Sequence, residues 1–340
     1  MKEKQVSTTA LIPRIEEQIL EKSLFKSGDR ILVACSGGPD STALFFLLRE
    51  LSLKHDWKLG LLHFNHRLRR DAKKDEAFVR SLARKFKVPF YCGRGNVTRE
   101  AKRTKTSLEE CARKMRYDFF LKAARLKKYS KIAFAHTRDD QAETVLMRIL
   151  QGTGLRGLQG IRECQRMGKT GIIRPLLCVT KNEILSFCRE ASVRYRLDKS
   201  NNCVKFLRNR IRRELIPALR RDFNPRVVEA LSRIPAIVSG ESELIGGLEE
   251  KAWKRTFKRI RGSKVELRRT PFLKCHPALQ FRLVDKALKL LDSRSGLSFE
   301  AWERLRCGLT RLRFCSSLPK DIDFALTSQK LTIYKKKRAS

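Results

Sequence analysis

The stretch Ser-Gly-Gly-Pro-Asp-Ser at residues 36–41 has the residue types that most directly indicate chemistry in this sequence. It follows an apolar run at residues 31–34 and precedes another at residues 43–48, a pattern that predicts a buried strand, a glycine turn and a helix. Glycines let the backbone approach an anion closely, and the free N–H groups of a helix N-terminus favour negative charge. The stretch is therefore a candidate phosphate or pyrophosphate site; the alternative is a turn whose glycines only allow close packing. The residues of this candidate site are Ser36, Gly37, Gly38, Pro39, Asp40 and Ser41.

Asp40 distinguishes this turn from the common nucleotide-binding loops. The turn has neither the Gly-Lys-Ser/Thr ending of a Walker loop nor the G-x-G-x-x-G of a dinucleotide fold. A carboxylate inside an anion cradle would repel phosphate unless it held a metal ion or a cationic group of the substrate. It suits a reaction in which Mg²⁺-bound pyrophosphate leaves ATP and AMP is transferred. Asp40 is therefore also the candidate metal ligand.

Asp140 and Glu143 form a second candidate site. Thr137 and Asp140 have the spacing of a helix cap, so a helix is predicted to begin here, directly after a strand. Asp140 and Glu143 share a face of this helix near its first turn, where paired acids can bind a cationic substrate or a metal. The alternative is that Asp139 and Asp140 only interact with the helix dipole and that Glu143 points to solvent.

Strands and helices are predicted to alternate along the first half of the chain. Strands are expected at residues 31–35, 58–64, 88–92 and 131–135, and helices at residues 11–25, 41–53, 71–86, 107–127 and 139–151, with a polar, basic segment at residues 94–106. This alternation predicts an α/β fold with a doubly wound, mostly parallel, Rossmann-like sheet. In such folds the ligand site lies beyond the carboxyl ends of the strands, where both candidate sites fall.

The rest of the chain is predicted to end in a second, smaller domain. After a loop from residue 152 we expect a helix capped by Thr180, an extended piece at residues 193–197 and a basic segment at residues 205–213. We place the domain boundary after Arg220, which gives a catalytic domain at residues 1–220 and a mainly helical domain at residues 221–340. The second domain is expected to have helices at residues 225–261, 271–291 and 298–309, and short strands at residues 264–267, 321–326 and 331–334.

The balance of charge indicates a nucleic-acid partner. The chain has 76 Lys and Arg residues against 36 Asp and Glu residues, a formal net charge of +40 that is far above what solubility requires. The charge density is nearly the same before and after Arg220, so both predicted domains are expected to face a polyanion. The alternative is a basic surface that only contacts solvent.

Cysteine usage and hydropathy indicate a cytoplasmic protein. The ten cysteines include no C-x-x-C pair, and the first ten residues are polar, unlike a secretory signal. No apolar run approaches the roughly 20 residues of a membrane span. We therefore expect free thiols in a reducing compartment and no membrane partner. The sequence is compatible with a homodimer.

Several motifs together resemble the signature set of the tRNA(Ile)-lysidine synthases, which are N-type ATP pyrophosphatases of the PP-loop family. They are S-G-G-P-D-S at residues 36–41, H-F-N-H-R-L-R at 63–69, L-E-E-C-A-R-K-M-R-Y at 108–117, H-T-R-D-D-Q-A-E-T-V-L-M-R at 136–148, G-T-G-L-R-G-L at 152–158, and D-K-S-N-N-x3-F-L-R-N-R-I-R-R-E-L-I-P at 198–217. The resemblance covers about the first 220 residues, and the last motif is the most discriminating. It implies an adenine nucleotide alpha hydrolase-like fold.

The resemblance implies a two-step ligase that uses ATP and Mg²⁺. In the first step ATP adenylates the C2 carbonyl oxygen of the wobble cytidine in an isoleucine tRNA whose anticodon is CAU, and pyrophosphate leaves. In the second step the ε-amine of free lysine displaces AMP, and lysidine forms. The implied partners are therefore tRNA(Ile) with a CAU anticodon and free lysine.

The resemblance also implies roles for individual residues. Residues 36–41 would cradle pyrophosphate, with Asp40 holding Mg²⁺ or orienting the amine, and Asp140 and Glu143 would receive the cationic lysine. Further implied roles are catalysis for His136, ATP binding for His63 and Arg113, and tRNA binding for Arg208, Asn209, Arg210 and Arg212. The alternatives are packed structural histidines and ion-pair roles for Arg116 and Arg212.

Two other functions are compatible with parts of the pattern. A tRNA thiolase would use the same loop but deliver sulfur, often through a C-x-x-C pair or an iron–sulfur cluster, and this sequence has no C-x-x-C pair. A non-catalytic RNA-binding protein with a degenerate nucleotide fold is the second alternative. The intact Asp40, Ser41, Asp140 and Glu143 argue against it.

About 120 residues follow the predicted catalytic domain, enough for one helical tRNA-recognition domain. The charged and aromatic residues at 253–259 are candidates for contact with the acceptor arm of tRNA. The alternative is a solvated face over a core that is anchored by Trp253.

Overall fold

The computed structural model describes residues 8–67, 71–197, 207–292, 296–311, 313–318 and 322–335. The chain folds into two compact units, Met1–Val238 and Ser239–Ser340, and the boundary falls inside helix α11 (Val227–Thr256). The boundary expected after Arg220 falls inside helix α10 (Ile216–Asp222), which belongs to the first unit. The motif residues 198–206 and the basic tail after Lys335 lie outside the described residues.

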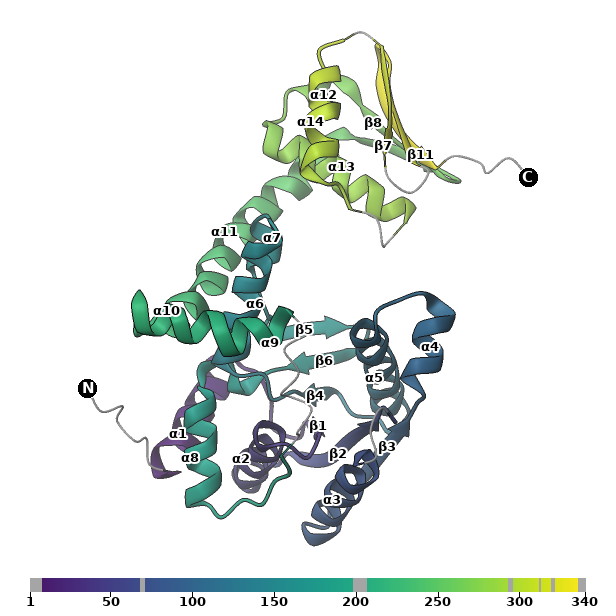
Figure 1. The fold of residues 1–340 in the computed structure, drawn as a ribbon. Coiled ribbons are helices and arrows are strands. Elements are labelled where there is room, and N and C mark those ends of the chain that lie inside the picture. The colour runs from purple at the N-terminus through teal and green to yellow at the C-terminus, as the bar shows by residue number, and fades with distance from the viewer. Residues whose placement is uncertain are drawn as a thin grey trace. The chain divides into compact units, whose positions relative to one another are not determined.

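A sheet of six described strands forms the centre of the first unit (Figure 1). Its order is β3-β2-β1-β4-β6-β5, and all neighbours are parallel except β5, which is antiparallel to β6. The expected doubly wound, mostly parallel sheet is therefore confirmed. The strands are β1 (Arg30–Ala34), β2 (Lys58–Asn65), β3 (Phe90–Arg94), β4 (Lys131–Ala133), β5 (Cys164–Met167) and β6 (Thr170–Ile173).

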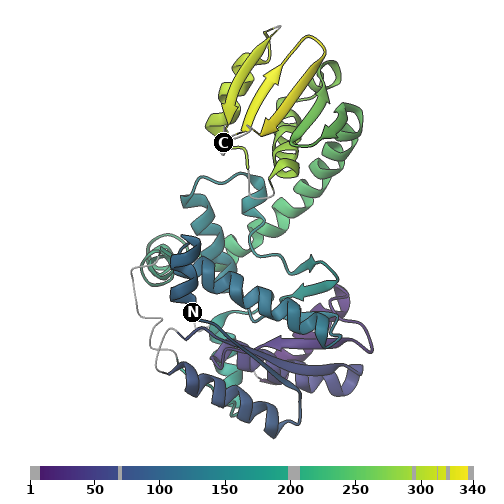
Figure 2. The same ribbon diagram turned by 90° about the vertical axis from the view of Figure 1, so that its right-hand side faces the viewer.

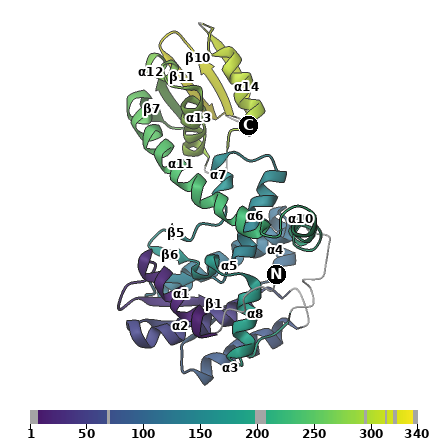
Figure 3. The same cartoon turned by 90° about the vertical axis from the view of Figure 1, so that its left-hand side faces the viewer.

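Helices cover both faces of this sheet, as Figures 1 and 3 show. Successive side chains of a strand point to opposite faces, so Ile31 and Val33 of β1 enter one core and Leu32 enters another. The second of these cores is closed by α5 (Leu108–Leu126). The helices around the first core are α1 (Thr8–Glu21), α2 (Pro39–His55), α3 (Ala72–Lys85) and α8 (Lys181–Glu190), with the 3₁₀ turn η1 (Pro175–Cys178).

A third, small core positions a helical segment against α6 (Arg138–Leu150). The segment runs through α9 (Leu207–Arg210), the π-helix η3 (Ile211–Leu215) and α10. Leu146 of α6 packs with Ile211 and Val228 in this core. The packing brings the side chains of α9 and η3 to the first turns of α6. The short helix α7 (Leu155–Leu158) follows α6 in the chain.

Helix α4 (Val97–Thr104) was not predicted from the sequence. It lies in the segment at residues 94–106, which was described from the sequence only as polar and basic. Val97 and Ala101 are its buried residues, and they pack with Cys111 of α5. Two apolar positions in eight residues are too few for a helical period to stand out.

The hairpin of β5 and β6 lies where a loop was expected. The chain reverses at Gly168, whose φ of +61° is in the left-handed region that favours glycine. β5 is largely exposed, so it lacks the alternation of apolar and polar residues that identifies a strand.

The second unit combines helices with a sheet of five described strands, all antiparallel to their neighbours, in the order β7-β8-β11-β10-β9. Figure 2 shows the strands of this unit in one layer and its helices in another. The strands predicted near residues 264, 322 and 331 are confirmed as β8, β10 and β11. The elements are β7 (Phe257–Arg261), β8 (Lys264–Arg268), α12 (Arg269–Leu273), α13 (Pro277–Leu291), α14 (Phe299–Gly308), β9 (Phe314–Leu318), β10 (Ile322–Leu326) and β11 (Lys330–Lys335).

The prediction that a helix continues to residue 261 was wrong, because α11 ends at Thr256 and the chain then enters β7. Trp253 stacks on Phe257 with ring centroids 5.1 Å apart and belongs to the core of this unit. Lys254 and Arg255 are exposed, whereas Arg259 forms an ion pair with Glu266 at 2.7 Å.

The cysteines that the structure describes are free thiols, as expected from their irregular spacing. Within the described ranges, no helix combines the length and the apolar character that crossing a bilayer requires.

Candidate active site

The glycine turn between β1 and α2 is held by hydrogen bonds within the turn. The Ser36 N–H donates to the Ser41 hydroxyl oxygen at 3.1 Å, and the Ser41 hydroxyl donates to the Gly38 carbonyl at 3.2 Å. Gly37 has a φ of +93°, and its carbonyl accepts the Arg196 N–H at 2.9 Å. Gly38 is the N-cap of α2 and has no capping side chain, which leaves first-turn N–H groups available to an anion. The turn therefore has the form of an anion cradle.

A cavity of about 560 Å³ opens beside this cradle at the carboxyl edge of the sheet. Phe64, Phe120 and Phe134 line it together with polar residues from the ends of β1 and β2 and the segment after β4. A polar end next to aromatic side chains suits a ligand with phosphates and a base. The predicted site residues that line the cavity are Ser36, Gly38, Asp40, Ser41, His63 and His136.

Asp40 has an unsatisfied carboxylate oxygen beside the cradle. Its Oδ1 is buried and makes no hydrogen bond within the described part of the chain, while its Oδ2 lies 3.5 Å from the Lys181 Nζ. Burial raises the pKa of Asp40 more than the Lys181 ammonium lowers it. Lys181 was not identified from the sequence, although the capping box at Thr180, which is confirmed, places it in the first turn of α8. A buried, unpaired carboxylate oxygen is a suitable ligand for a cation.

His63 and His136 line the cavity as neutral imidazoles. The His63 Nδ1 lies 2.9 Å from the Cys35 carbonyl, which can only accept, so Nδ1 carries the proton and Nε2 is an acceptor. Burial lowers the pKa of His63 and also that of His136, where it outweighs the opposite effect of Asp140. The His136 Nδ1 is buried without a hydrogen bond to any described residue. Both rings can orient a polar ligand group without adding charge.

Arg116 reaches the cavity and Arg113 does not. The Arg113 side chain is exposed, with its guanidinium carbon 5.0 Å from the centroid of the Tyr117 ring. The Arg116 side chain lines the cavity; its Nε is buried without a hydrogen bond, and none of the described carboxylates pairs with it. Burial lowers the pKa of Arg116. A largely buried guanidinium without a counter-ion indicates an anionic ligand.

No sequence pattern favours Arg116 over Arg113. The two arginines are three residues apart on α5, and both lie close to the buried stripe of that helix that contains Tyr117 and Phe120. The helical repeat predicts the face of α5 on which each arginine lies. Which of the two lies level with the cavity depends on how α5 packs on the sheet.

Asp140 and Glu143 lie together, as predicted, but two arginines contact them. Arg208 donates to Glu143 at 2.8 Å and to Asp140 at 2.9 Å. Arg212 donates twice to Glu143, at 2.5 and 2.9 Å, and approaches Asp140 at 3.4 Å. Glu143 is only 1% exposed, so it does not point to solvent. The capping box of Thr137 and Asp140 is confirmed.

This carboxylate–arginine cluster consists of two anions and two cations. Burial would raise the pKa of Asp140, but Arg208, His136 and the Thr137 N–H together lower it, so the carboxylate is ionised at neutral pH. The two arginines, predicted to bind tRNA, are half-buried and directed at the carboxylates. Among the other residues assigned to tRNA, Arg210 is exposed and lies 3.6 Å from Glu214, while Asn209 is half-buried.

A family model described as "PP-loop domain" matches residues 10–219 of the chain. Three proteins named tRNA(Ile)-lysidine synthase are similar to it. Identity to the protein of Clostridioides difficile is 34% over 284 residues, which cover 82% of this chain and 60% of that protein. Identity to the protein of Symbiobacterium thermophilum is 38% over 288 residues, with coverage of 82% and 59%. Identity to the protein of Petrotoga mobilis is 36% over 225 residues, with coverage of 66% and 71%.

The chain spans about three fifths of the length of the first two relatives. Among solved structures, the U34-tRNA thiolase NcsA from Methanococcus maripaludis with its [4Fe-4S] cluster has a TM-score of 0.57 to this chain. Sequence identity is 17%, and the match covers 68% of this chain and 80% of that one. At this identity the likeness shows the fold alone.

The cradle, the parallel sheet and the family match all lie within the same part of the chain, and the relatives match across it. The chain therefore belongs to the PP-loop domain family, among the tRNA(Ile)-lysidine synthase sequences.

Proposed function

We propose that this protein joins free lysine to C2 of the wobble cytidine in isoleucine tRNA with a CAU anticodon, converting ATP to AMP and pyrophosphate. The observation that carries this proposal is one cavity that combines an anion cradle with an Asp40 oxygen and an Arg116 Nε that have no hydrogen-bond partner among the described residues. The names of the relatives support the choice of tRNA and amine. The cytoplasm, which supplies all three substrates, is the proposed site of action.

Asp40 fits a role in holding Mg²⁺. Its buried Oδ1 has no hydrogen-bond donor within the described residues and lies beside the cradle that would hold the outer phosphates. Mg²⁺ is commonly held by one or two carboxylates together with substrate phosphates and water. The ion would supply charge neutralisation for the departing pyrophosphate.

In the first step, the cytosine O2 attacks the α-phosphorus of ATP while the bond to the bridging oxygen of pyrophosphate breaks. Arg116 faces the cavity and pairs with no carboxylate in the described part of the chain, so its guanidinium can stabilise negative charge on the α-phosphate. The neutral His63 and His136 can orient the nucleotides by hydrogen bonds. The phenylalanine side chains of the cavity would limit the access of water to the adenylated cytidine once the nucleotides are bound.

In the second step, the uncharged ε-amine of lysine attacks C2, and AMP leaves with the former O2. Asp140 and Glu143 would receive the lysine ammonium before it loses a proton to a carboxylate. This requires Arg208 or Arg212 to give up its contacts to the carboxylates, and an incoming tRNA phosphate offers a substitute anion. The exchange leaves neither the buried carboxylates nor the arginines unpaired. It also accounts for both the predicted tRNA role and the observed ion pairs of the arginines.

We expect Asp140→Ala to raise the KM for lysine by about 10- to 100-fold, the usual effect of losing a hydrogen bond to a charged group. The KM for ATP should change little, because Asp140 does not line the ATP cavity. Initial rates with labelled lysine at several ATP concentrations measure both constants. Asp118→Ala removes an exposed carboxylate from α5 and is the control. An unchanged lysine dependence would exclude Asp140 from the amine site.

The reaction itself is tested with the purified protein, transcript tRNA(Ile), ATP and labelled lysine. We expect one lysine to enter tRNA for each AMP released, and a methionine tRNA transcript to accept much less. Release of ADP, or AMP release without label in tRNA, would contradict the ligase. Sulfur incorporation from a supplied donor would instead identify a thiolase.

A further inference from the structure

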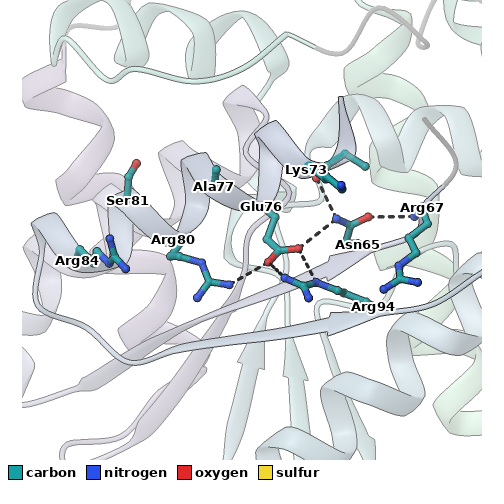
Figure 4. A pocket seen from close by; sticks show the side chains of 10 residues that line it. Asn65, Arg67, Lys73, Glu76, Ala77, Arg80, Ser81, Arg84 and Arg94 are labelled. Atoms are coloured by element: carbon teal, nitrogen blue, oxygen red, sulfur yellow. Dashed lines mark hydrogen bonds and ion pairs between the residues drawn. The ribbon is translucent and has the colours of Figure 1, made fainter. Parts of the chain in front are cut away.

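A second cavity, of about 1070 Å³, lies along α3 and the end of β3 (Figure 4). We call it the α3 groove. The charged residues that line it are one acid and five bases, namely Glu76, Arg67, Lys73, Arg80, Arg84 and Arg94. The cations therefore exceed the anion by four. No function assigned so far uses these residues.

The groove is elongated because two neighbouring rows of α3 side chains line it, one of them Lys73, Ala77 and Ser81. Ala72, Glu76, Arg80 and Arg84 recur every four residues and are all lining residues. At about 1.5 Å of rise per residue, the twelve steps from Ala72 to Arg84 span about 18 Å. β3 is an edge strand of the sheet, so the groove runs beside an open margin of the unit. This length suits a chain of several charges better than a single ion.

Glu76 fixes two of the five cations. It is buried and accepts hydrogen bonds from Arg94 at 2.6 and 3.0 Å, from Arg80 at 2.9 Å and from the Asn65 amide at 3.2 Å. Figure 4 shows Arg80 and Arg94 converging on this carboxylate from the helix and the strand. The carboxylate is therefore enclosed, while the arginine side chains remain about half exposed. Preorganised guanidiniums of this kind suit phosphate oxygens.

The other three cations, Arg67, Lys73 and Arg84, are exposed and form no ion pair with a described residue. The acidic residues near the start of α3 form ion pairs with residues that do not line the groove. Asp71 pairs with Lys74 at 2.9 Å, and Asp75 pairs with Arg196 at 2.6 Å. The positive charge of the groove is thus not neutralised by neighbouring acids.

The groove adjoins the candidate active site. Asn65 and Ala72 line both cavities, so one end of the groove meets the cavity that contains the anion cradle. A nucleic-acid strand with one base in the active cavity would therefore have its neighbouring phosphates at the mouth of the groove.

We propose that the α3 groove binds the phosphates of the tRNA strand that flanks the modified nucleotide. The proposal rests on the proposed function for the identity of the RNA. Binding is through phosphate charge, so it is independent of base sequence and weakens with added salt. The groove thereby holds the anticodon strand in register with the active cavity.

The test uses the double variant Lys73→Ala/Arg84→Ala, whose residues are exposed on α3, where alanine favours the helix. Losing two phosphate contacts should weaken tRNA binding about 10- to 30-fold at roughly 0.15 M salt and reduce the slope of log Kd against log salt by about 1.4 to 1.8. The affinity for ATP should be unchanged. Binding is measured with transcript tRNA, without ATP or lysine, across a salt series, and thermal unfolding checks the fold.

The control is Lys122→Ala/Arg125→Ala, which removes the same charge from exposed positions of α5. Equal losses in both variants would overturn the proposal, since general charge would then explain the effect. Wild-type tRNA affinity in the α3 variant would also overturn it, as would a loss of ATP affinity alone, which would make the groove a nucleotide site. Groove-dependent tRNA binding in a wild-type protein that forms no lysidine would refute the proposed function and leave the groove in place.

Discussion

Replacing Arg116 with glutamine is expected to lower the rate of AMP formation by about 100- to 1,000-fold, the usual effect of removing one preorganised charge-stabilising group. Arg116 lines the active cavity and has no carboxylate partner in the described chain, so its charge is available to the phosphates of ATP. Burial disfavours the charged guanidinium and lowers its pKa, so a neutral glutamine should not destabilise the fold through lost electrostatics. Single-turnover assays with saturating tRNA and ATP measure the chemical step.

The matched control for this prediction is Arg113→Gln. It makes the same change three residues earlier on the same helix, at a side chain that is exposed and outside the cavity. We expect its rate to stay within about threefold of wild type, as is usual for changes that touch no reacting group. If the two variants lost activity equally, or if Arg113→Gln lost more, Arg116 would not be the cation that stabilises the phosphate.

The second large effect is expected for Asp40→Asn, with a loss of at least about 100-fold in rate and a higher Mg²⁺ concentration for half-maximal activity. Asparagine keeps the shape of the side chain but removes the charge that would hold a cation beside the cradle. The stability of the folded state, unlike the rate, should not fall. Because the pKa of Asp40 is raised in the folded state, its ionised form at neutral pH opposes folding, and asparagine removes this effect. The Tm should therefore be unchanged or higher.

Asp139→Asn is the control for Asp40→Asn. Burial also raises the pKa of Asp139, but its carboxylate accepts the Lys181 N–H at 2.7 Å, a hydrogen bond that an amide oxygen can also accept. We expect its activity and its Mg²⁺ dependence to stay close to wild type. A Mg²⁺ titration curve of Asp40→Asn that matched wild type would contradict a role of Asp40 in holding Mg²⁺.

The elements that the sequence predicted well are those with a clear local pattern of apolar residues or helix caps. The first four strands are apolar runs, and helices α6 and α8 begin at recognisable caps, Thr137 and Thr180, so these elements could be placed within a few residues. β7 could not be predicted, because Phe257–Arg261 has neither an apolar run nor a strict alternation. Its strand conformation depends on pairing with β8 across a turn at Gly262.

The sequence by itself determined the cradle at residues 36–41 and the alternation of strands and helices, and hence the edge of the sheet where the polar residues gather. It could do so because a parallel α/β unit places every strand end on the same side. Tertiary structure alone decided that Arg116 rather than Arg113 enters the cavity and that Arg208 and Arg212 face Asp140 and Glu143. The helical repeat predicts the face of a helix on which a side chain lies. Contacts between residues separated by 65 or more positions in the sequence depend on how separate helices pack.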